Sequence, residues 1–297
     1  MVKIEHIKDF NLDHIFDCGQ CFRWAKEEDD SYTGIAFGKI VNIKATPSQQ
    51  MGSMNQIKMK QGLTHQDLNC LIDLEIDHTN EEDVEKIWRH YLDLERDYGP
   101  IKELLSKNDS VMAKAIEYGY GIRILNQDKW ETIVSFLISQ NNNIPRIKKC
   151  IESLCRNFGE YVGEYKGKKY YDIPKPEVLS SLSVQDLEEC RLGYRAKYII
   201  ETAKQVESDG IEETFDYLNT LCGVGPKVAN CVLLFSMGKI DCFPIDVWVK
   251  RVMNQLYGMN QEDTKAMDAF SKKNFGNYGG IAQQYLFYFI REGQVSC

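Results

Sequence analysis

Two glycines and a proline between two helical stretches limit the fold of this chain more than any other feature. Residues 211–221 resemble a helix with polar ends, Gly223-Val224-Gly225 follow, and Pro226 opens an apolar helix that stops at Gly238. Proline at the first helical position and glycine just past the end are typical of a helix of about three turns. The pattern predicts a tight helix-hairpin-helix over about residues 211–238, whose unpaired backbone N–H groups suit a phosphate.

Lys227 and Asp246 place reactive side chains beside this hairpin. Lys227 lies in the first turn of the second helix, and Asp246 follows nineteen residues later, directly before Val247. Taken alone, Lys227 is more often a surface lysine and Asp246 a helix cap, although a cap also fixes the position of the carboxylate. An amine can act as a nucleophile. A phosphate cradle, a lysine and an aspartate in one short stretch therefore indicate chemistry on a nucleic acid.

The positions of the histidines add weight to this pair. The chain has 297 residues, enough for two domains, and its five histidines all lie within the first ninety. The helical region that carries the hairpin consequently has no histidine for a triad, a general base or a metal site. Its chemistry must use other side chains, which favours Lys227 and Asp246.

The ten cysteines raise the alternatives of a disulfide framework or a metal site. Cys18 and Cys21 form one CxxC, but no second CxxC and no suitably spaced histidine accompany it. The sequence also lacks a four-cysteine cluster suited to an iron–sulfur centre. We therefore expect reduced, mostly buried thiols, with no metal and no cofactor.

The net charge of −8 would argue against a DNA partner if it were spread evenly. Residues 73–97 alone hold ten acidic and three basic residues, whereas residues 141–156 and 191–204 each hold four basic residues and one acidic. Phosphate binding depends on local basic residues, so the overall sign excludes nothing. The N-terminus lacks the apolar run of a signal peptide and no apolar helix is long enough for a bilayer, so we expect a soluble intracellular protein without a membrane partner.

The order of the patterns predicts an α+β fold. Within residues 1–105, alternating apolar and polar residues predict strands at 22–24, 32–44, 57–60 and 71–77, followed by an acidic helix at 81–98. Residues 106–297 read almost entirely as helices, with caps such as Asp128 and Asp246 and a basic hairpin at 163–171. We expect an N-terminal antiparallel sheet domain and then an all-α, two-lobed domain.

Other stretches of the chain carry a resemblance to a known family. They are CGQCFRW (18–24), NNNIPR (141–146), LGYRAKY (192–198) and GGIAQQYLF (279–287), together with GVGPK (223–227) and PID (244–246). In this order, over about residues 10–287, they resemble the 8-oxoguanine DNA glycosylase/AP lyases of the helix-hairpin-helix (HhH-GPD) superfamily. The resemblance implies excision of 8-oxoguanine opposite cytosine from duplex DNA, followed by β-elimination 3′ to the abasic site.

Carried over by position, the resemblance assigns a catalytic pair and a base pocket. Lys227 would attack the sugar C1′ and form a Schiff base, and Asp246 would stabilise the positive charge on the sugar. The backbone carbonyl of Gly19 would accept the N7 proton that distinguishes 8-oxoguanine from guanine. Cys231 and Phe287 would sandwich the base, and Gln283 would hydrogen-bond its pairing edge. Read alone, Cys231 and Phe287 would be core residues and Gly19 a turn glycine.

The resemblance also implies a set of DNA contacts. Tyr194 would act as an aromatic wedge. The orphaned cytosine would be held by Asn141, Arg146 and Arg195. The phosphate-binding hairpin would consist of Gly223, Val224 and Gly225. Three positions depart from the family pattern. Cys18 stands where a serine often precedes the glycine, Trp248 where a histidine can contact phosphate, and Asn230 where an acidic residue lies beside the pocket. The expected partner is double-stranded DNA bound by a monomer, in the nucleoid or the nucleus.

Two rival interpretations stay open. A glycosylase for other lesions, such as alkylated purines, would use the same scaffold, but such enzymes often lack the lysine. A non-catalytic DNA-binding module would use the hairpin for phosphate alone and would not require Lys227 and Asp246 together.

Overall fold

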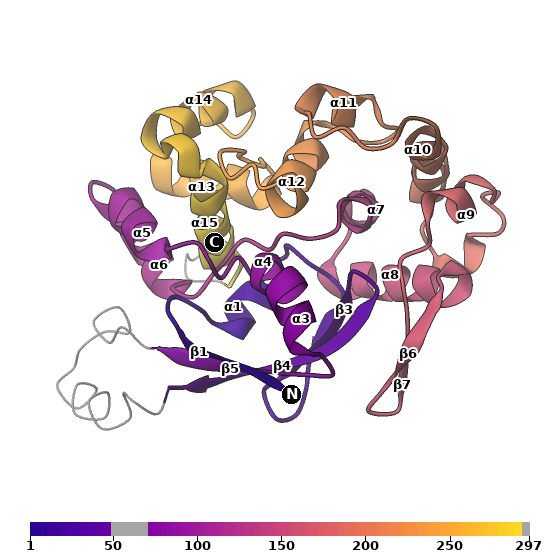
Figure 1. Ribbon diagram of the computed structural model, residues 1–297. Helices are drawn as coiled ribbons and strands as arrows, with labels where there is room; N and C mark the ends of the chain where they lie inside the picture. Colours follow the sequence, from indigo (N-terminus) through magenta and orange to yellow (C-terminus); the bar gives the residue numbers. More distant parts are fainter. Residues whose placement is uncertain (49–70, 293–297) are drawn as a thin grey trace.

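The protein is an α+β structure in which a five-stranded antiparallel sheet precedes a large helical region, as predicted (Figure 1). The computed structural model describes residues 1–48 and 71–292. The strand expected at 57–60 lies outside the described residues. Within the described part of the chain, no helix is long and apolar enough to cross a membrane.

The sheet has the strand order β1-β5-β4-β3-β2. Its strands are β1 (Val2–Ile7), β2 (Trp24–Lys26), β3 (Tyr32–Ala36), β4 (Lys39–Pro47) and β5 (Ile72–Asp77). Strands β3 and β4, predicted as one stretch, are split by a turn at Phe37 and Gly38, both with positive φ, which suits a two-residue hairpin. Strand β1 was not predicted, and its partner is far along the chain: Val2 pairs with Ile76.

Helices lie against the sheet and form most of the rest of the molecule (Figure 1). The N-terminal ones are α1 (Leu12–Phe16), α3 (Glu81–Asp83) and α4 (Arg89–Tyr91), the last two joined by a π-helical turn, Val84–Trp88. The predicted helix at 81–98 is therefore shorter, because the chain turns after Tyr91 and restarts at Tyr98. The sequence analysis missed that next helix, α5 (Tyr98–Ser106).

The helical region contains a second small sheet, the predicted basic hairpin, formed by β6 (Tyr161–Tyr165) and β7 (Lys168–Tyr171). Its helices are α6 (Ser110–Tyr118), α7 (Lys129–Ser139), α8 (Ile144–Phe158), α9 (Pro176–Ser180), α10 (Arg195–Asp209), α11 (Phe215–Thr220), α12 (Pro226–Ser236), α13 (Val247–Tyr257), α14 (Thr264–Asn274) and α15 (Gly279–Arg291).

Side-chain caps explain where several of these helices begin. The Asp128 carboxylate accepts the N–H of Glu131 at the start of α7, and Asp246 caps α13, both as predicted. Ser183 and Asp186 exchange the reciprocal bonds of a capping box, but a short 3₁₀ turn follows instead of a helix. The sequence therefore indicates where capping hydrogen bonds form, even where it does not predict the length of the helix that follows.

The described residues form two large apolar cores and a small cluster of Ile35, Ile40 and Tyr170 between the main sheet and the β6–β7 hairpin. The sheet core contains Trp24 and Trp88, and the larger helical core contains α7 and α12 at its centre. Tyr98 and Leu105, just before the expected domain boundary at 105/106, pack in the helical core. The division into 1–105 and 106–297 stays a prediction.

Candidate active site

One cavity of about 390 Å³ brings together residues from both ends and the middle of the chain. Its walls come from the loop before β2, the C-terminal half of α7, the start of α8, and helices α12, α13 and α15. All six residues predicted for the catalytic pair and the base pocket line it: Gly19, Lys227, Cys231, Asp246, Gln283 and Phe287. The predicted catalytic pair and the predicted base pocket therefore share one space.

Lys227 and Asp246 enter this cavity from two helix N-termini. Lys227 occupies the first turn of α12, half-buried, with its Nζ 5.0 Å from the centre of the Phe136 ring. The Asp246 carboxylate accepts the N–H groups of Trp248 at 3.0 Å and Val249 at 2.8 Å, which fixes its orientation. Burial raises the pKa of Asp246, and the opposing effects are the Val249 N–H bond, the Lys227 charge and the Trp248 N–H bond.

Gly19 is held in a conformation that few other residues tolerate. Its φ is +77°, and a Cβ built there would lie 3.2 Å from Phe287 Cε1. Both the left-handed backbone and the close ring favour glycine at this position. The loop thus presents its backbone directly to the aromatic wall of the cavity.

Gln20, directly after Gly19, anchors this loop from within the core. Its Nε2 donates to the carbonyl oxygens of Ile15 at 2.9 Å and Arg123 at 2.8 Å, and its Oε1 accepts the Leu125 N–H at 2.9 Å. Its own carbonyl accepts Nε2 of Gln127 at 2.7 Å. With its side chain fully buried and satisfied, Gln20 determines where the Gly19 carbonyl lies.

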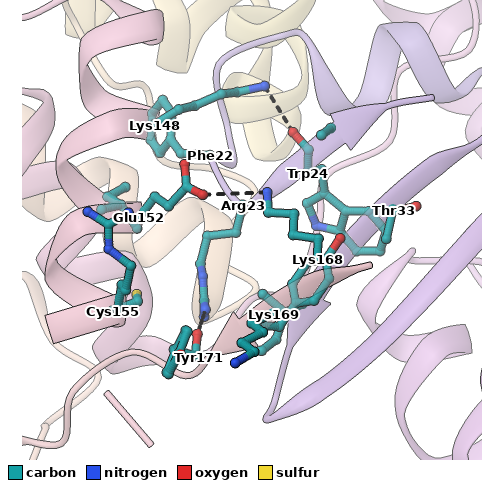
Figure 2. Close-up of a pocket in the computed structure, with 15 residues that line it drawn as sticks. Phe22, Arg23, Trp24, Thr33, Lys148, Glu152, Cys155, Lys168, Lys169 and Tyr171 are labelled. Atoms are coloured by element: carbon teal, nitrogen blue, oxygen red, sulfur yellow. Dashed lines mark hydrogen bonds and ion pairs between the residues drawn. The ribbon is translucent and has the colours of Figure 1, made fainter. Parts of the chain in front are cut away.

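Arg23 fastens the other end of the same loop, beside a smaller cavity of about 180 Å³ that α8, the sheet and the β6–β7 hairpin enclose. Its guanidinium donates to Glu131 on α7 at 2.9 Å, to Asp172 at 3.3 Å and to the carbonyl oxygen of Tyr171. Figure 2 shows the bond to Tyr171. Through one buried arginine, the loop is tied to the helical region and the hairpin.

The side chains expected around the base differ in how they are satisfied. Cys231 is buried, and burial raises the pKa of its thiol to about 11, so it offers an apolar face rather than a nucleophile. Phe287 is half-buried, so part of its side chain is exposed to solvent. Gln283 is buried, and its Oε1 has no hydrogen-bond partner. A polar ligand in the cavity would supply one.

The predicted opposite-base residues form a second cluster, near the N-terminus of α8. The Asn141 amide donates to the Tyr194 hydroxyl at 3.2 Å, and the Arg195 guanidinium lies 4.6 Å from the centre of the Tyr194 ring. Arg195 is buried and donates to the carbonyl oxygens of Gln140 at 2.8 Å, Asn141 at 3.0 Å and Leu192 at 3.2 Å. In this structure Arg195 therefore braces the loop, a role that its sequence context did not indicate.

Arg146, the other predicted arginine, is exposed at the start of α8. Its guanidinium donates to the Arg191 carbonyl oxygen at a long 3.4 Å, and its backbone N–H donates to Asn143 Oδ1 at 3.1 Å. Tyr194 is also exposed, with 48% of its surface accessible to solvent. Both side chains are therefore accessible at the surface of the molecule.

The hairpin has the geometry that its glycines predicted. Gly223 has a φ of +79°, and a Cβ there would overlap the Tyr198 ring at 2.4 Å. Val224 is buried, whereas Gly225 is exposed and directly precedes α12. The N–H groups of Gly223 and Gly225 have no partner among the described residues, as a phosphate site requires. The Gly223 carbonyl accepts Nε2 of Gln140 at 3.1 Å, which joins the hairpin to the second cluster.

Sequence reasoning missed several side chains of the cavity wall, chiefly Phe136, Arg291 and the departing residue Trp248. Arg291 had a readable signal, because it lies four and eight residues after Phe287 and Gln283 and so shares their face of α15. The Arg251 guanidinium carbon lies 4.8 Å from the centre of the Trp248 ring. Asn230, another departure from the family pattern, is half-buried and is not part of the cavity wall.

Neither CxxC thiol is poised to react, although Cys18 lines the cavity. Cys18 donates to the Ile15 carbonyl at 3.3 Å, and burial raises its pKa to about 12. In the ranges 1–48 and 71–292, no three His, Cys, Asp or Glu side chains are grouped as a metal site would require.

Two family models divide the chain between them. "8-oxoguanine DNA glycosylase, N-terminal domain" matches residues 2–133, and "HhH-GPD superfamily base excision DNA repair protein" matches residues 134–276. The junction falls inside α7, the helix to which Arg23 ties the N-terminal loop.

Solved structures match nearly the whole chain. MBOgg1 in complex with a low affinity DNA ligand is 46% identical, with a TM-score of 0.85, over 99% of this chain and 96% of that one. The Clostridium acetobutylicum 8-oxoguanine glycosylase/lyase, in complex with double-stranded DNA containing cytosine opposite 8-oxoG, is 38% identical. Its TM-score is 0.84 and the match covers 99% of both chains.

A curated relative matches in part. The N-glycosylase/DNA lyase of Saccharomyces cerevisiae is 35% identical over 211 residues, which are 56% of this chain and 56% of that protein. The match therefore spans little more than half the length of this relative.

Proposed function

The chain belongs to the 8-oxoguanine DNA glycosylase/lyase family of the HhH-GPD superfamily, and on this premise we propose that it excises 8-oxoguanine opposite cytosine from duplex DNA in base excision repair. It would then cleave the strand 3′ to the abasic site. We propose that it acts as a monomer on chromosomal DNA, without a cofactor.

The observation that carries the proposal is the shared cavity. Lys227 and Asp246 line the same space as Gly19, Gln283 and Phe287, although the chain separates Gly19 from Lys227 by more than two hundred residues. A phosphate-binding module alone would need only the hairpin. A nucleophile, a carboxylate and a pocket with unpaired polar groups support excision of a base.

The reaction follows from these groups. Lys227 Nζ attacks C1′ of the sugar, the C1′–N9 bond breaks, and the base leaves with its electron pair. Asp246, ionised and fixed by its cap bonds, stabilises the positive charge that develops at C1′. Opening of the sugar ring gives a Schiff base, and loss of a C2′ proton then expels the 3′ phosphate by β-elimination.

Discrimination of 8-oxoguanine from guanine would use the proton on N7. The enzyme must extrude the base to reach its glycosidic bond, at a cost of a few kcal/mol. The Gly19 carbonyl would accept the N7–H of 8-oxoguanine, whereas guanine would present a lone pair to it. An unsatisfied buried carbonyl costs roughly 1–3 kcal/mol, which is enough for useful discrimination.

The opposite base would be read at the second cluster. Arg146 and Asn141 are exposed and carry forked donors suited to base edges. Tyr194 would fill the gap left by the extruded base. Arg195 would hold the cytosine together with the loop that it already braces.

The test is covalent trapping of the Schiff base. Incubation with borohydride and a duplex containing 8-oxoguanine opposite cytosine should give a stable protein–DNA complex and, without borohydride, a nicked strand. Lys227→Gln should abolish both, while Lys273→Gln, an exposed lysine on α14, should change neither. Trapping that persists in Lys227→Gln would refute the assignment. Faster excision of an alkylated purine in the same duplex would favour the rival glycosylase.

A further inference from the structure

The buried, unpaired side-chain polar atoms of the described residues all lie on one helix, α15. They are Gln283 Oε1, Gln284 Oε1, Tyr285 OH and Arg291 Nη1. Three of these four residues line the cavity that holds Lys227 and Asp246. Such atoms each cost about 1–3 kcal/mol unless a ligand or water pairs them, so their grouping marks a wall built for a polar ligand.

Arg291 is the cation in this set. Its Nε and Nη2 donate to the Glu292 carboxylate at 2.9 and 2.6 Å, and Nη2 also donates to the carbonyl oxygen of Asp17. These bonds fix the guanidinium plane while Nη1 keeps two N–H groups without an acceptor. The side chain is only 15% exposed, so solvent offers little compensation.

The free nitrogen lies beside the backbone proposed to read the lesion. From an ideal Cβ position on Gly19, Arg291 Nη1 is 3.7 Å away. The guanidinium also lies 5.6 Å from the centre of the Phe287 ring and 5.8 Å from that of Tyr288. A backbone carbonyl that can accept and a guanidinium that can donate therefore stand next to each other at one end of the cavity.

We propose that Arg291 is a specificity-determining residue that donates from Nη1 to a carbonyl oxygen next to N7 of the bound base. The inference rests on the function proposed above. In 8-oxoguanine the N7–H is flanked by carbonyl oxygens at C6 and C8, which is the complement of an acceptor beside a donor. Because Nη1 is closed off by its neighbours, the contact forms as the Phe287 ring shifts to stack on the base.

Excision and abasic-site cleavage separate this role from a structural one. In single-turnover assays, Arg291→Met should lower excision from the 8-oxoguanine:cytosine duplex by about tenfold to a hundredfold, the loss expected for a hydrogen bond to a charged group. Cleavage at a preformed abasic site, where no base is present, should stay unchanged. Arg89→Met, which removes an arginine paired with Glu85 on a distant helix, should affect neither.

A conservative variant tests the direct contact. Arg291→Lys can still bond to the Asp17 carbonyl but has no second nitrogen to offer, so it should keep the stability of the loop and remain deficient in excision. Full excision by Arg291→Lys, or equal losses of excision and abasic-site cleavage in Arg291→Met, would overturn the proposal. If the unaltered protein excised no 8-oxoguanine, the proposed function itself would fail.

Binding identifies which oxygen is read. In the Lys227→Gln background, affinities would be measured for duplexes with 8-oxoguanine or 8-oxoadenine, which lacks the C6 carbonyl, opposite cytosine. Weaker binding of both duplexes by Arg291→Met assigns the C8 oxygen, and weaker binding of 8-oxoguanine alone assigns the C6 oxygen. Unchanged affinity for both contradicts the proposal.

Discussion

The base cavity and the opposite-base cluster are neighbours that differ in how their polar groups are satisfied. In the cavity, Gln283 and Arg291 hold buried atoms without partners. In the cluster, Arg195 donates hydrogen bonds to the backbone carbonyl oxygens of Gln140, Asn141 and Leu192. The cavity is thus incomplete without a ligand, whereas the cluster is already braced.

This difference suggests a division of work between the two regions. Unpaired groups gain most when a matching ligand arrives, so the cavity is suited to discriminate among bases. A braced loop costs little reorganisation on binding, so the cluster is suited to hold a fixed shape against the duplex. Substitutions in the cavity should therefore change selectivity, and substitutions of the brace should change stability.

The largest effect is expected from Gly19→Ala. The new methyl group would impose strain at a φ of +77° and would press on Phe287, which together should cost excision about 3–4 kcal/mol in transition-state stabilisation. Single-turnover excision and cleavage at a preformed abasic site would be measured in parallel. Equal losses in both assays would mean that the loop serves the catalytic pair and not the base.

Arg195→Met should mainly affect stability. It leaves several loop carbonyls without donors, and we expect the free energy of unfolding to fall by about 2–3 kcal/mol. The matched change Arg146→Met, at an exposed position, should stay within about 0.5 kcal/mol while weakening the preference for cytosine. Denaturant unfolding and excision opposite each of the four bases check both. Equal stability of the two variants would remove the distinction drawn between them.

The pH dependence of excision tests the cavity from its catalytic side. Burial raises the pKa of Asp246, so protonation begins above the ordinary range of an aspartate, about 3.9. Below the raised pKa the carboxyl is neutral and cannot balance the charge on the sugar, so the rate should fall tenfold, about 1.4 kcal/mol, for each further pH unit. If the rate of excision fell only at or below the pKa range of an ordinary aspartate, this role of Asp246 would be contradicted.

The smallest effect is expected from Tyr194→Phe. This change removes the bond from the Asn141 amide and a long one, at 3.4 Å, to the Gln140 carbonyl oxygen, but it keeps the ring that Arg195 contacts. Stability and excision should therefore change by less than about 0.5 kcal/mol. Tyr194→Ala, which removes the ring itself, should weaken binding to lesion DNA measurably more. Similar binding by both variants would argue against a wedge at this position.

Local chemistry explains what the sequence could predict. The cap at Asp246, the hairpin glycines and the helix opened by Pro226 depend on neighbours within a few residues, and all three were readable. Strand β1 was missed because Val2 pairs with Ile76, a partner that no local pattern reveals. The roles carried over from the family were brought into one cavity by the fold, but they stay predictions until the variants are tested.

Arg195 and Arg291 show where sequence reasoning ended. Both arginines lie near family motifs. The sequence alone does not show whether the guanidinium is bonded to loop carbonyls, as in Arg195, or keeps an unpaired nitrogen, as in Arg291. The difference is decided by which carbonyls the folded chain places around each guanidinium: Gln140 and Asn141 around one, Asp17 beside the other. Only the tertiary structure supplies that information.

The hydrogen bonds of Gln20 restrict how an enzyme of this kind could change the set of damaged bases that it accepts. The atom proposed to read N7 belongs to the main chain, so no exchange of a side chain can delete it. Its position, however, depends on the four hydrogen bonds of Gln20 to Ile15, Arg123, Leu125 and Gln127. Selection for a new substrate, in nature or in the laboratory, would have to move the carbonyl by altering these buried supports, none of which lines the cavity.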